Sequence, residues 1–119
     1  MCRRSAGIDV VIKRISLVRR RPDLSADEFV AYWLGPHADI AREMPGALGY
    51  VVNVAQDPEE AGWDGFAEVW FESREAAEAA FASEPFASRI RADRPKFVAE
   101  QRIFFVDETT VLEPPGDRG

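Results

Sequence analysis

Cysteine and histidine are almost missing from this sequence, which contains one of each, Cys2 and His37. A single cysteine cannot form a disulfide within the chain. One thiol and one imidazole also cannot supply the four ligands of a typical zinc site, so we expect no bound metal. The sequence further lacks a run of about 18 apolar residues that would span a membrane. Residues Met1 to Asp9 lack the apolar stretch of a signal peptide, so we expect a cytoplasmic protein.

Basic residues are also fewer than acidic ones. Lys and Arg number 15 against 21 Asp and Glu, which gives a net charge of -6. Affinity for nucleic acid or an anionic membrane depends on basic surface, so neither partner is expected. The chain has no phosphate-binding glycine loop, dinucleotide fingerprint or G-x-S-x-G turn, which predicts that it uses no nucleotide cofactor and no serine nucleophile. We expect no cofactor of any kind.

What the chain does have is enough apolar sequence for one packed domain. Its 119 residues are 46% hydrophobic, an ordinary share for a globular protein. Three Trp, two Tyr and eight Phe indicate an apolar pocket or an oligomer interface. We place a single domain at residues 9–112, with flexible tails at 1–8 and at the Pro- and Gly-containing segment 113–119.

Hydrophobic patterns and capping residues predict the secondary structure. Strands are expected at 10–18, 48–55, 66–71 and 102–112, because β-branched and aromatic residues are concentrated there. The Ser25 to Glu28 spacing of a capping box predicts that a helix begins at that point, and Gly35-Pro36 predicts a kink in it. Ser73 is suited to cap a second helix over 74–81. Residues 56–63 are expected to be a polar loop, and 85–100 to be helical but divided by Pro95.

This βαββαβ order is that of the ferredoxin-like α+β fold, in which helices cover one face of a four-stranded antiparallel sheet. Strand 66–71 is apolar on both faces apart from Glu68. A sheet with one face in water would instead alternate polar and apolar residues. We therefore expect the second face to be covered by another copy of the chain, in a homodimer.

His37 and Tyr50 are the candidate catalytic residues. His37 shares the apolar face of its helix with Phe29 and Trp33, and an ordinary histidine titrates near neutral pH, as a general acid or base must. Tyr50 lies in the strand that follows and could hold the imidazole or donate to an oxyanion. The alternative is structural: a half-buried histidine that hydrogen-bonds a carbonyl, and a tyrosine that packs on the sheet.

Aromatic residues are the candidate substrate contacts. Trp33, Trp70, Phe29 and Phe66 could form the wall of a pocket for a flat apolar ligand, although residues at such spacings are often plain core. Glu68 either pairs with a basic residue such as Lys13 or Arg14, or sits in the pocket with a raised pKa. Arg89, Arg91, Arg94 and Lys96 form either a cluster that steers an anionic substrate or a solvated helix face.

Several of these residues occur in two blocks of sequence that together are characteristic of one family. The first contains Phe29, Tyr32-Trp33, His37, Pro45-Gly46 and Tyr50, and the second contains Asp64-Gly65, Ala67-Glu68 and Trp70-Phe71, followed by Phe105 to Glu108. From about residue 12 to 112 the chain resembles the EthD family of dimeric α/β-barrel proteins. The resemblance implies the dimeric barrel and no metal or nucleotide.

The resemblance also bears on activity. Members of the 4-methylmuconolactone methylisomerase type have a helix histidine thirteen residues before a strand tyrosine, as His37 and Tyr50 are placed here. The family resemblance thus implies a cofactor-independent cyclase, isomerase or dehydratase that acts by acid/base chemistry on a small apolar carbonyl compound, polyketide- or lactone-like. Two alternatives stay open. One is a cofactor-free monooxygenase of anthrone- or quinol-like rings, and the other is a non-catalytic dimer that binds a hydrophobic ligand.

Overall fold

The computed structural model describes residues 11–116. Its elements are β1 (Ile12–Arg20), α1 (Ala26–Tyr32), a π-helical turn (Trp33–His37), α2 (Ala38–Ala41), β2 (Gly49–Val54), α3 (Pro58–Ala61), β3 (Gly65–Phe71), α4 (Arg74–Ala80), α5 (Phe86–Asp93), a 3-10 turn (Arg94–Lys96) and β4 (Val98–Val106). Cys2, the predicted tail 1–8, the domain's expected start at residues 9 and 10, and positions 117–119 of the predicted C-terminal tail lie outside the described residues.

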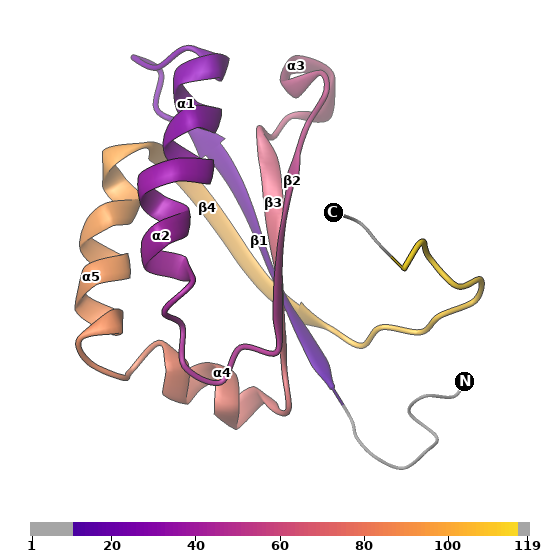
Figure 1. Cartoon of the computed structure of the whole chain (residues 1–119). Coiled ribbons are helices and arrows are strands. Elements are labelled where there is room, and N and C mark those ends of the chain that lie inside the picture. Colours follow the sequence, from indigo (N-terminus) through magenta and orange to yellow (C-terminus); the bar gives the residue numbers. More distant parts are fainter. Residues whose placement is uncertain (1–10, 117–119) are drawn as a thin grey trace.

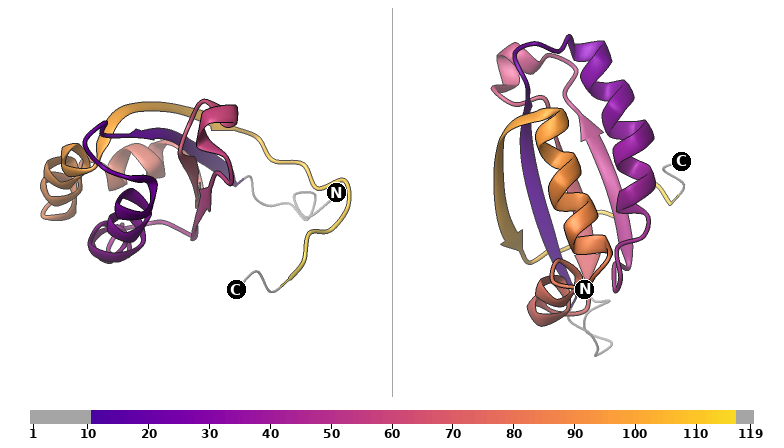
Figure 2. Two further views of the ribbon diagram at one scale, coloured as in Figure 1. Left: turned by 90° about the horizontal axis from the view of Figure 1, so that it is seen from above. Right: turned by 90° about the vertical axis from the view of Figure 1, so that its left-hand side faces the viewer.

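One antiparallel sheet carries the fold. Its strand order is β2-β3-β1-β4, so the two central strands are β3 and β1. Helices α1, α2, α4 and α5 lie on one side of this sheet, whereas α3 lies in the connection between β2 and β3 at its end (Figures 1 and 2). α1 and α2 run as one column beside α5, and α2 contacts α5. The chain therefore has the predicted α+β, ferredoxin-like fold.

Local capping residues determine where two helices begin. The Ser25 side chain accepts a hydrogen bond from the Glu28 backbone N–H, and the Glu28 carboxylate accepts one from the Ser25 backbone N–H. This reciprocal capping box satisfies two backbone donors that the first helical turn leaves free. Ser73 caps α4 by accepting from the Ala76 N–H. Both predicted helix starts are confirmed.

The predicted kink at Gly35-Pro36 is a π-helical turn. Pro36 has no N–H to continue the α-helical ladder, and its ring would clash with the carbonyl four residues earlier. The turn Trp33–His37 takes up the extra residue, and α2 then continues from Ala38. Such turns change which direction the following side chains face. Trp33 and His37, at the two ends of the turn, are both buried under the helix layer.

Two segments differ from the sequence-based prediction. β4 begins at Val98 rather than at 102 and ends at Val106 rather than at 112. The strand starts early because Pro95 ends the helical segment, after which Val98 and Glu100 pair with Arg20 and Arg19 of β1. The expected loop 56–63 contains the single helical turn α3, which Asp57 caps and Gly62 ends.

The Asp64-Gly65 pair joins the helix layer to the sheet. The Asp64 carboxylate accepts hydrogen bonds from the Arg20 backbone and guanidinium, at 2.9 and 2.6 Å. A Cβ atom added at Gly65 would lie 2.2 Å from the Asn53 carbonyl oxygen and 2.9 Å from the Trp33 ring. Only glycine lets Trp33 pack so closely on the sheet.

The described helices are short. None of those in residues 11–116 has both the length and the apolar character needed to cross a membrane.

Candidate active site

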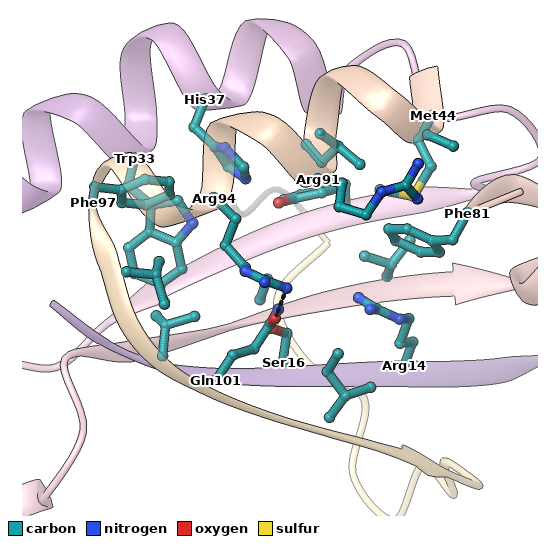
Figure 3. A pocket seen from close by; sticks show the side chains of 18 residues that line it. Arg14, Ser16, Trp33, His37, Met44, Phe81, Arg91, Arg94, Phe97 and Gln101 are labelled. Carbon is teal, nitrogen blue, oxygen red and sulfur yellow. Dashed lines mark hydrogen bonds between the residues drawn. The ribbon is translucent and has the colours of Figure 1, made fainter. Parts of the chain in front are cut away.

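A cavity of about 250 Å³ lies between the sheet and the helices. Its floor consists of residues from all four strands, and its roof of residues from the helical segments (Figure 3). Trp33 and His37 enter it from the π-helical turn, and Tyr50 enters it from β2. The cavity is mainly apolar and somewhat smaller than the roughly 300–1,000 Å³ of most ligand pockets, so it suits a small molecule.

His37 and Asp93 form a buried pair at the roof of this cavity. The His37 Nδ1 atom lies 2.8 Å from the Asp93 Oδ2 atom. The two side chains come from the π-helical turn and from the last residue of α5, and both are less than a tenth exposed. Figure 3 shows the imidazole directed from the helix layer toward the interior of the cavity.

The pair fixes which imidazole nitrogen carries the proton. Burial would raise the pKa of Asp93, but the hydrogen bonds from Tyr32 and His37 bring it below its ordinary value, so the carboxylate is ionised at neutral pH. An ionised carboxylate only accepts hydrogen bonds, so Nδ1 must donate and Nε2 is left as the acceptor. Burial lowers the pKa of His37 below 6.5, and this outweighs the opposing effect of Asp93. The result is a neutral imidazole whose free nitrogen can take a proton.

Asp93 is itself held in place on its other oxygen. Tyr32 donates a hydrogen bond from its hydroxyl to Asp93 Oδ1 at 2.7 Å, and the Lys96 ammonium lies 3.6 Å from the same atom. The hydrogen bond to Asp93, with burial, raises the pKa of Tyr32 to about 12. Tyr32 therefore stays a donor at any pH at which the protein would work. The sequence prediction gave Asp93 no role, and Tyr32 only its place in the family motif.

Tyr50 lines the same cavity but does not hold the imidazole as predicted. Within residues 11–116, no hydrogen bond joins Tyr50 to His37, and the imidazole is instead held at Nδ1 by Asp93. Burial raises the pKa of Tyr50, although Arg14 opposes this effect. The phenol is therefore neutral, and its hydroxyl can donate to a ligand oxygen.

Of the predicted aromatic contacts, Trp33 reaches the cavity and Phe29 supports it. Trp33 is 2% exposed and lines the cavity together with Phe97. Phe29 is fully buried behind Trp33, with ring centroids 5.3 Å apart, and does not line the cavity. It acts on the site through the position of the Trp33 ring.

Phe66, Glu68 and Trp70 are on the opposite face of the sheet and do not line the cavity. Side chains alternate along a strand, and the cavity side of β3 is occupied by Ala67 and Val69. Glu68 takes the predicted pairing with Lys13, at 2.8 Å. The Lys13 ammonium also lies 3.2 Å from Glu108, which accepts a hydrogen bond from the Trp70 indole.

The polar part of the cavity lining is basic. Arg14, Arg91 and Arg94 line it, and among the residues that the structure describes no Asp or Glu does. Arg94 donates to the Gln101 side chain at 2.8 Å, the bond drawn in Figure 3. Arg89 and Lys96, from the same predicted cluster, do not line the cavity. Both side chains are exposed, and Arg89 pairs with Glu43 whereas Lys96 lies near the buried Asp93.

A metal-dependent site does not fit the described residues. No group of three or more His, Cys, Asp or Glu side chains within 11–116 is arranged to hold a metal ion. The titratable and charged groups at the cavity are one imidazole backed by a carboxylate, one neutral phenol and three guanidinium groups, beside the polar Ser16 and Gln101. This set can move a proton and can stabilise negative charge.

Comparison with known proteins gives the fold and the family. A solved EthD-family (ethyl tert-butyl ether D) protein from Bacillus halodurans C-125 superposes with a TM-score of 0.69 at 20% identity, over 83% of this chain and 99% of that one. The hydroxynitrile lyase of Passiflora edulis gives a TM-score of 0.68 at 12% identity, over 89% and 100%. A dimeric ferredoxin-like protein of unknown function from Thermobifida fusca YX gives 0.67 at 13%, over 84% and 92%.

No sequence among the curated proteins matches this chain. The family model of the EthD domain, in contrast, matches residues 21–101, which include the capping box, the π-helical turn, the glycine of β3 and Asp93. This match covers more than half of the sequence. The chain therefore belongs to the EthD family.

Proposed function

We propose that this protein is a cofactor-independent enzyme that moves a proton on a small apolar carbonyl compound, in an isomerisation, cyclisation or dehydration. The observation that carries the proposal is the Asp93–His37 hydrogen bond, which leaves Nε2 as the free nitrogen of an imidazole directed into an apolar cavity. A general base must present a free lone pair, and its pKa must keep it unprotonated at the working pH. Both conditions hold for His37.

The reaction begins when His37 Nε2 removes a proton from the carbon next to the substrate carbonyl. The C–H bond breaks, its electron pair forms the carbon–carbon double bond of an enolate, and negative charge moves to the carbonyl oxygen. The imidazolium formed is stabilised by Asp93, to which its Nδ1–H stays hydrogen-bonded. When the substrate has a carbon–carbon double bond next to this carbon, the product is a dienolate, and return of the proton from Nε2 to its far carbon shifts the double bond and completes an isomerisation without an electron acceptor.

Tyr50 is the donor placed to stabilise the enolate oxygen. Its hydroxyl is buried in the cavity and protonated, because burial raises the pKa of Tyr50. A hydrogen bond directed at the developing charge stabilises the transition state more than the neutral carbonyl. Asp93 does not touch the substrate in this scheme and is a positioning residue.

Two further observations support small-molecule chemistry. Trp33, Phe97 and the β3 residue Val69 give the cavity apolar walls that exclude water from the reacting atoms. The Passiflora protein, which shares the fold, is a lyase. At 12% identity it supports the idea that this fold can house an enzyme of small molecules, and it does not indicate the substrate.

The proposal is tested by proton exchange on a model carbonyl compound. We would incubate 2-tetralone in D2O with the wild-type protein and follow loss of its α-proton signals by NMR. His37→Gln, which keeps size and polarity but removes the base, should lower the enzyme-catalysed exchange rate by about 10²–10⁴-fold. Glu43→Gln, at an exposed carboxylate outside the cavity, is the matched control and should exchange at the wild-type rate.

Exchange that is equally fast with His37→Gln would contradict the proposal. Saturable binding of 2-tetralone without any exchange would favour the non-catalytic ligand-binding alternative. Uptake of oxygen with an anthrone as substrate, independent of His37, would favour the cofactor-free monooxygenase.

We further propose that two copies of the chain pair through the sheet face that the helices leave uncovered. Ile15, Leu17 and Phe104 lie on that face beside Phe66, and Phe104 is 42% exposed. Apolar side chains that gather on one face of a sheet are characteristic of an interface. The Thermobifida protein of the same fold is described as dimeric, which supports this arrangement.

A further inference from the structure

Arg14 and Tyr50 line the cavity from positions on β1 and β2 that are level with each other across the sheet. Residue Val69 of β3 pairs with Arg14 on one side and with Tyr50 on the other. The backbones of β1 and β2 are thus two strand spacings apart, about 10 Å. Because Val69 is short, the two longer side chains extend past it into the same part of the cavity. Tyr50 and Arg14 are close enough to affect each other's pKa.

The Arg14 guanidinium has no carboxylate partner among residues 11–116. Most described basic side chains pair with an acid, as Lys13 does with Glu68 and Arg20 does with Asp64. Arg14 instead stacks on the Phe81 ring, with the guanidinium carbon 4.0 Å from the ring centroid (Figure 3). Stacking engages the flat face of the group and leaves its N–H donors, which lie in the plane, free for a ligand.

The electrostatic surroundings strengthen this point. The chain carries a net charge of -6, yet Arg14, Arg91 and Arg94 line the cavity and, in the part of the chain that is described, no acidic residue does. Burial and the nearby Arg94 lower the pKa of Arg14 to about 10, which still leaves it charged at neutral pH. Arg14 is partly buried, and a partly desolvated charge without a partner costs free energy that a counter-charge can offset.

We propose that Arg14 forms a binding subsite for a carboxylate, with the Tyr50 hydroxyl left as the donor to the substrate carbonyl, so that the substrate is an apolar carbonyl compound that also carries a carboxylic acid. A carboxylate is a permanent anion and can accept two parallel N–H bonds from one guanidinium. It therefore offsets the partly buried charge of Arg14 before any reaction occurs, which a transient enolate does not. This inference rests on the proposed function of the cavity and names its class of substrate.

The apolar part of the ligand then has a defined place. Phe81 and Met44 lie on the Arg14 side of the cavity, whereas Trp33 and Phe97 are on the His37 side (Figure 3). Val69 is the strand neighbour of Arg14. A ligand whose carboxylate meets Arg14 would extend its apolar body across the cavity toward the imidazole. The Arg91 guanidinium lies 3.8 Å from the Glu84 carboxylate, and its side chain is more exposed to solvent than that of Arg14. We therefore expect Arg91 to attract an anion toward the cavity and Arg14 to bind it.

The test compares two probes of equal shape, naphthalene-1-carboxylate and the uncharged 1-acetylnaphthalene, by calorimetry at neutral pH. Wild-type protein should bind the carboxylate about tenfold or more tightly than the ketone, as expected for a charge-assisted bidentate contact. Arg14→Gln should remove this preference while ketone binding persists. Arg14→Lys, which keeps the charge but not the planar fork, should retain part of it.

Arg89→Gln is the control, because this exposed arginine pairs with Glu43 and does not line the cavity. It should leave the preference unchanged. Equal binding of the two probes to wild-type protein would overturn the inference. So would a failure of the carboxylate to bind at millimolar concentration, or a preference that survives Arg14→Gln and is lost in Arg94→Gln.

Failure of this inference is distinguishable from failure of the proposed function. Binding does not require proton transfer, so His37→Gln should keep the carboxylate preference even though it loses exchange activity. Carboxylate preference without any exchange in wild type would leave the subsite standing and contradict the catalytic role. If exchange depends on His37 but the wild-type protein shows no preference for the carboxylate probe, the catalytic role stands and the carboxylate subsite is contradicted.

Discussion

Asp93 and His37 stand 56 positions apart in the sequence, yet their side chains are joined by a 2.8 Å hydrogen bond beneath the surface. One residue ends α5 and the other ends the π-helical turn, so the bond links the two helical columns that cover the sheet. Because Tyr32 holds the second Asp93 oxygen, the imidazole has one favoured orientation. The predictions below follow largely from this arrangement.

Asp93→Asn should impair catalysis without unfolding the protein. An amide can still contact Nδ1, but it does not stabilise an imidazolium and can favour the wrong tautomer. In the serine-protease triad the equivalent change lowers kcat by about 10⁴-fold, and we expect a loss of at least about 10²-fold in the exchange assay. A merely structural role for Asp93 would leave the pH profile of the remaining activity unchanged, whereas a positioning role should move it. Tyr32→Phe, which removes only the outer hydrogen bond, should have a smaller effect.

The activity should decrease as the pH falls below neutrality. Burial lowers the pKa of His37 below 6.5, and the base works only when it is unprotonated. The acid limb of the kcat/KM profile should therefore lie below pH 6.5, with activity falling as pH decreases through it. An acid limb centred above pH 6.5 would show that the charged form of His37 is favoured in the protein, contrary to this account.

The free energy of unfolding should also depend on the protonation of His37 and Asp93. Between the lowered pKa of His37 and 6.5, the unfolded chain binds more protons than the native protein, so the free energy of unfolding should decrease as pH falls through this window. Asp93, whose pKa is also lowered, should add a second decrease below pH 3.8. Urea unfolding as a function of pH measures both. His37→Gln should abolish the first decrease and reduce the second without removing it, because Tyr32 still donates to Asp93.

Tyr50→Phe should lower kcat more than it changes KM for an uncharged ketone. Removal of one donor from an oxyanion site typically costs about 10²–10³-fold in kcat, whereas the apolar contact of the ring is kept. Michaelis kinetics of the exchange reaction separate the two parameters. A rise in KM with unchanged kcat would mean that the Tyr50 hydroxyl binds substrate and transition state equally.

Gly65→Ala should destabilise the fold and disturb the cavity. The added methyl group would meet the Asn53 carbonyl at 2.2 Å and push against Trp33, and such overpacking costs about 1–3 kcal/mol. The midpoint of urea unfolding reports this change. Gly35→Ala is a matched control, because nothing lies within 4 Å of its added methyl, and it should be as stable as wild type or slightly more so.

Phe104→Glu should break the proposed dimer. This side chain lies on the uncovered sheet face, where a partner would have to bury the new charge without a counter-charge. Light scattering after size-exclusion chromatography should give twice the chain mass for wild type and the single mass for the variant. Leu34→Glu, at an exposed site of the π-helical turn, should remain dimeric. A monomeric wild type would contradict the interface.

Much of the fold could be predicted because its signals are local. The Ser25 and Ser73 caps, the Gly35-Pro36 break and the β-branched runs each concern neighbouring residues, and each predicted element exists. The start of β4 could not be predicted in this way. Residues from Val98 to Glu100 are extended because they pair with β1, far away in the sequence.

The candidate site was harder to predict because it depends on contacts between distant segments. His37, Trp33 and Tyr50 could be chosen by residue type and spacing, and all three line the cavity. Phe66, Glu68 and Trp70 could not be assigned to a face, since β3 is apolar on both sides. Asp93 sits in an arginine-rich segment, yet its spacing of three from Ile90 and seven from Phe86 follows the buried face of the helix. A carboxylate at a position that the helical spacing predicts to be buried was the signal by which Asp93 could have been identified as a site residue.

The most direct test of the central claim is an NMR titration of the His37 ring nitrogens, in wild type and in Asp93→Asn. With one histidine in the chain, both signals are unambiguous. We predict a neutral ring at pH 7 with the proton on Nδ1 and a pKa below 6.5, and a changed tautomer balance in the variant. A ring protonated on Nε2, or a pKa at or above 6.5 that does not respond to Asp93→Asn, would contradict the account.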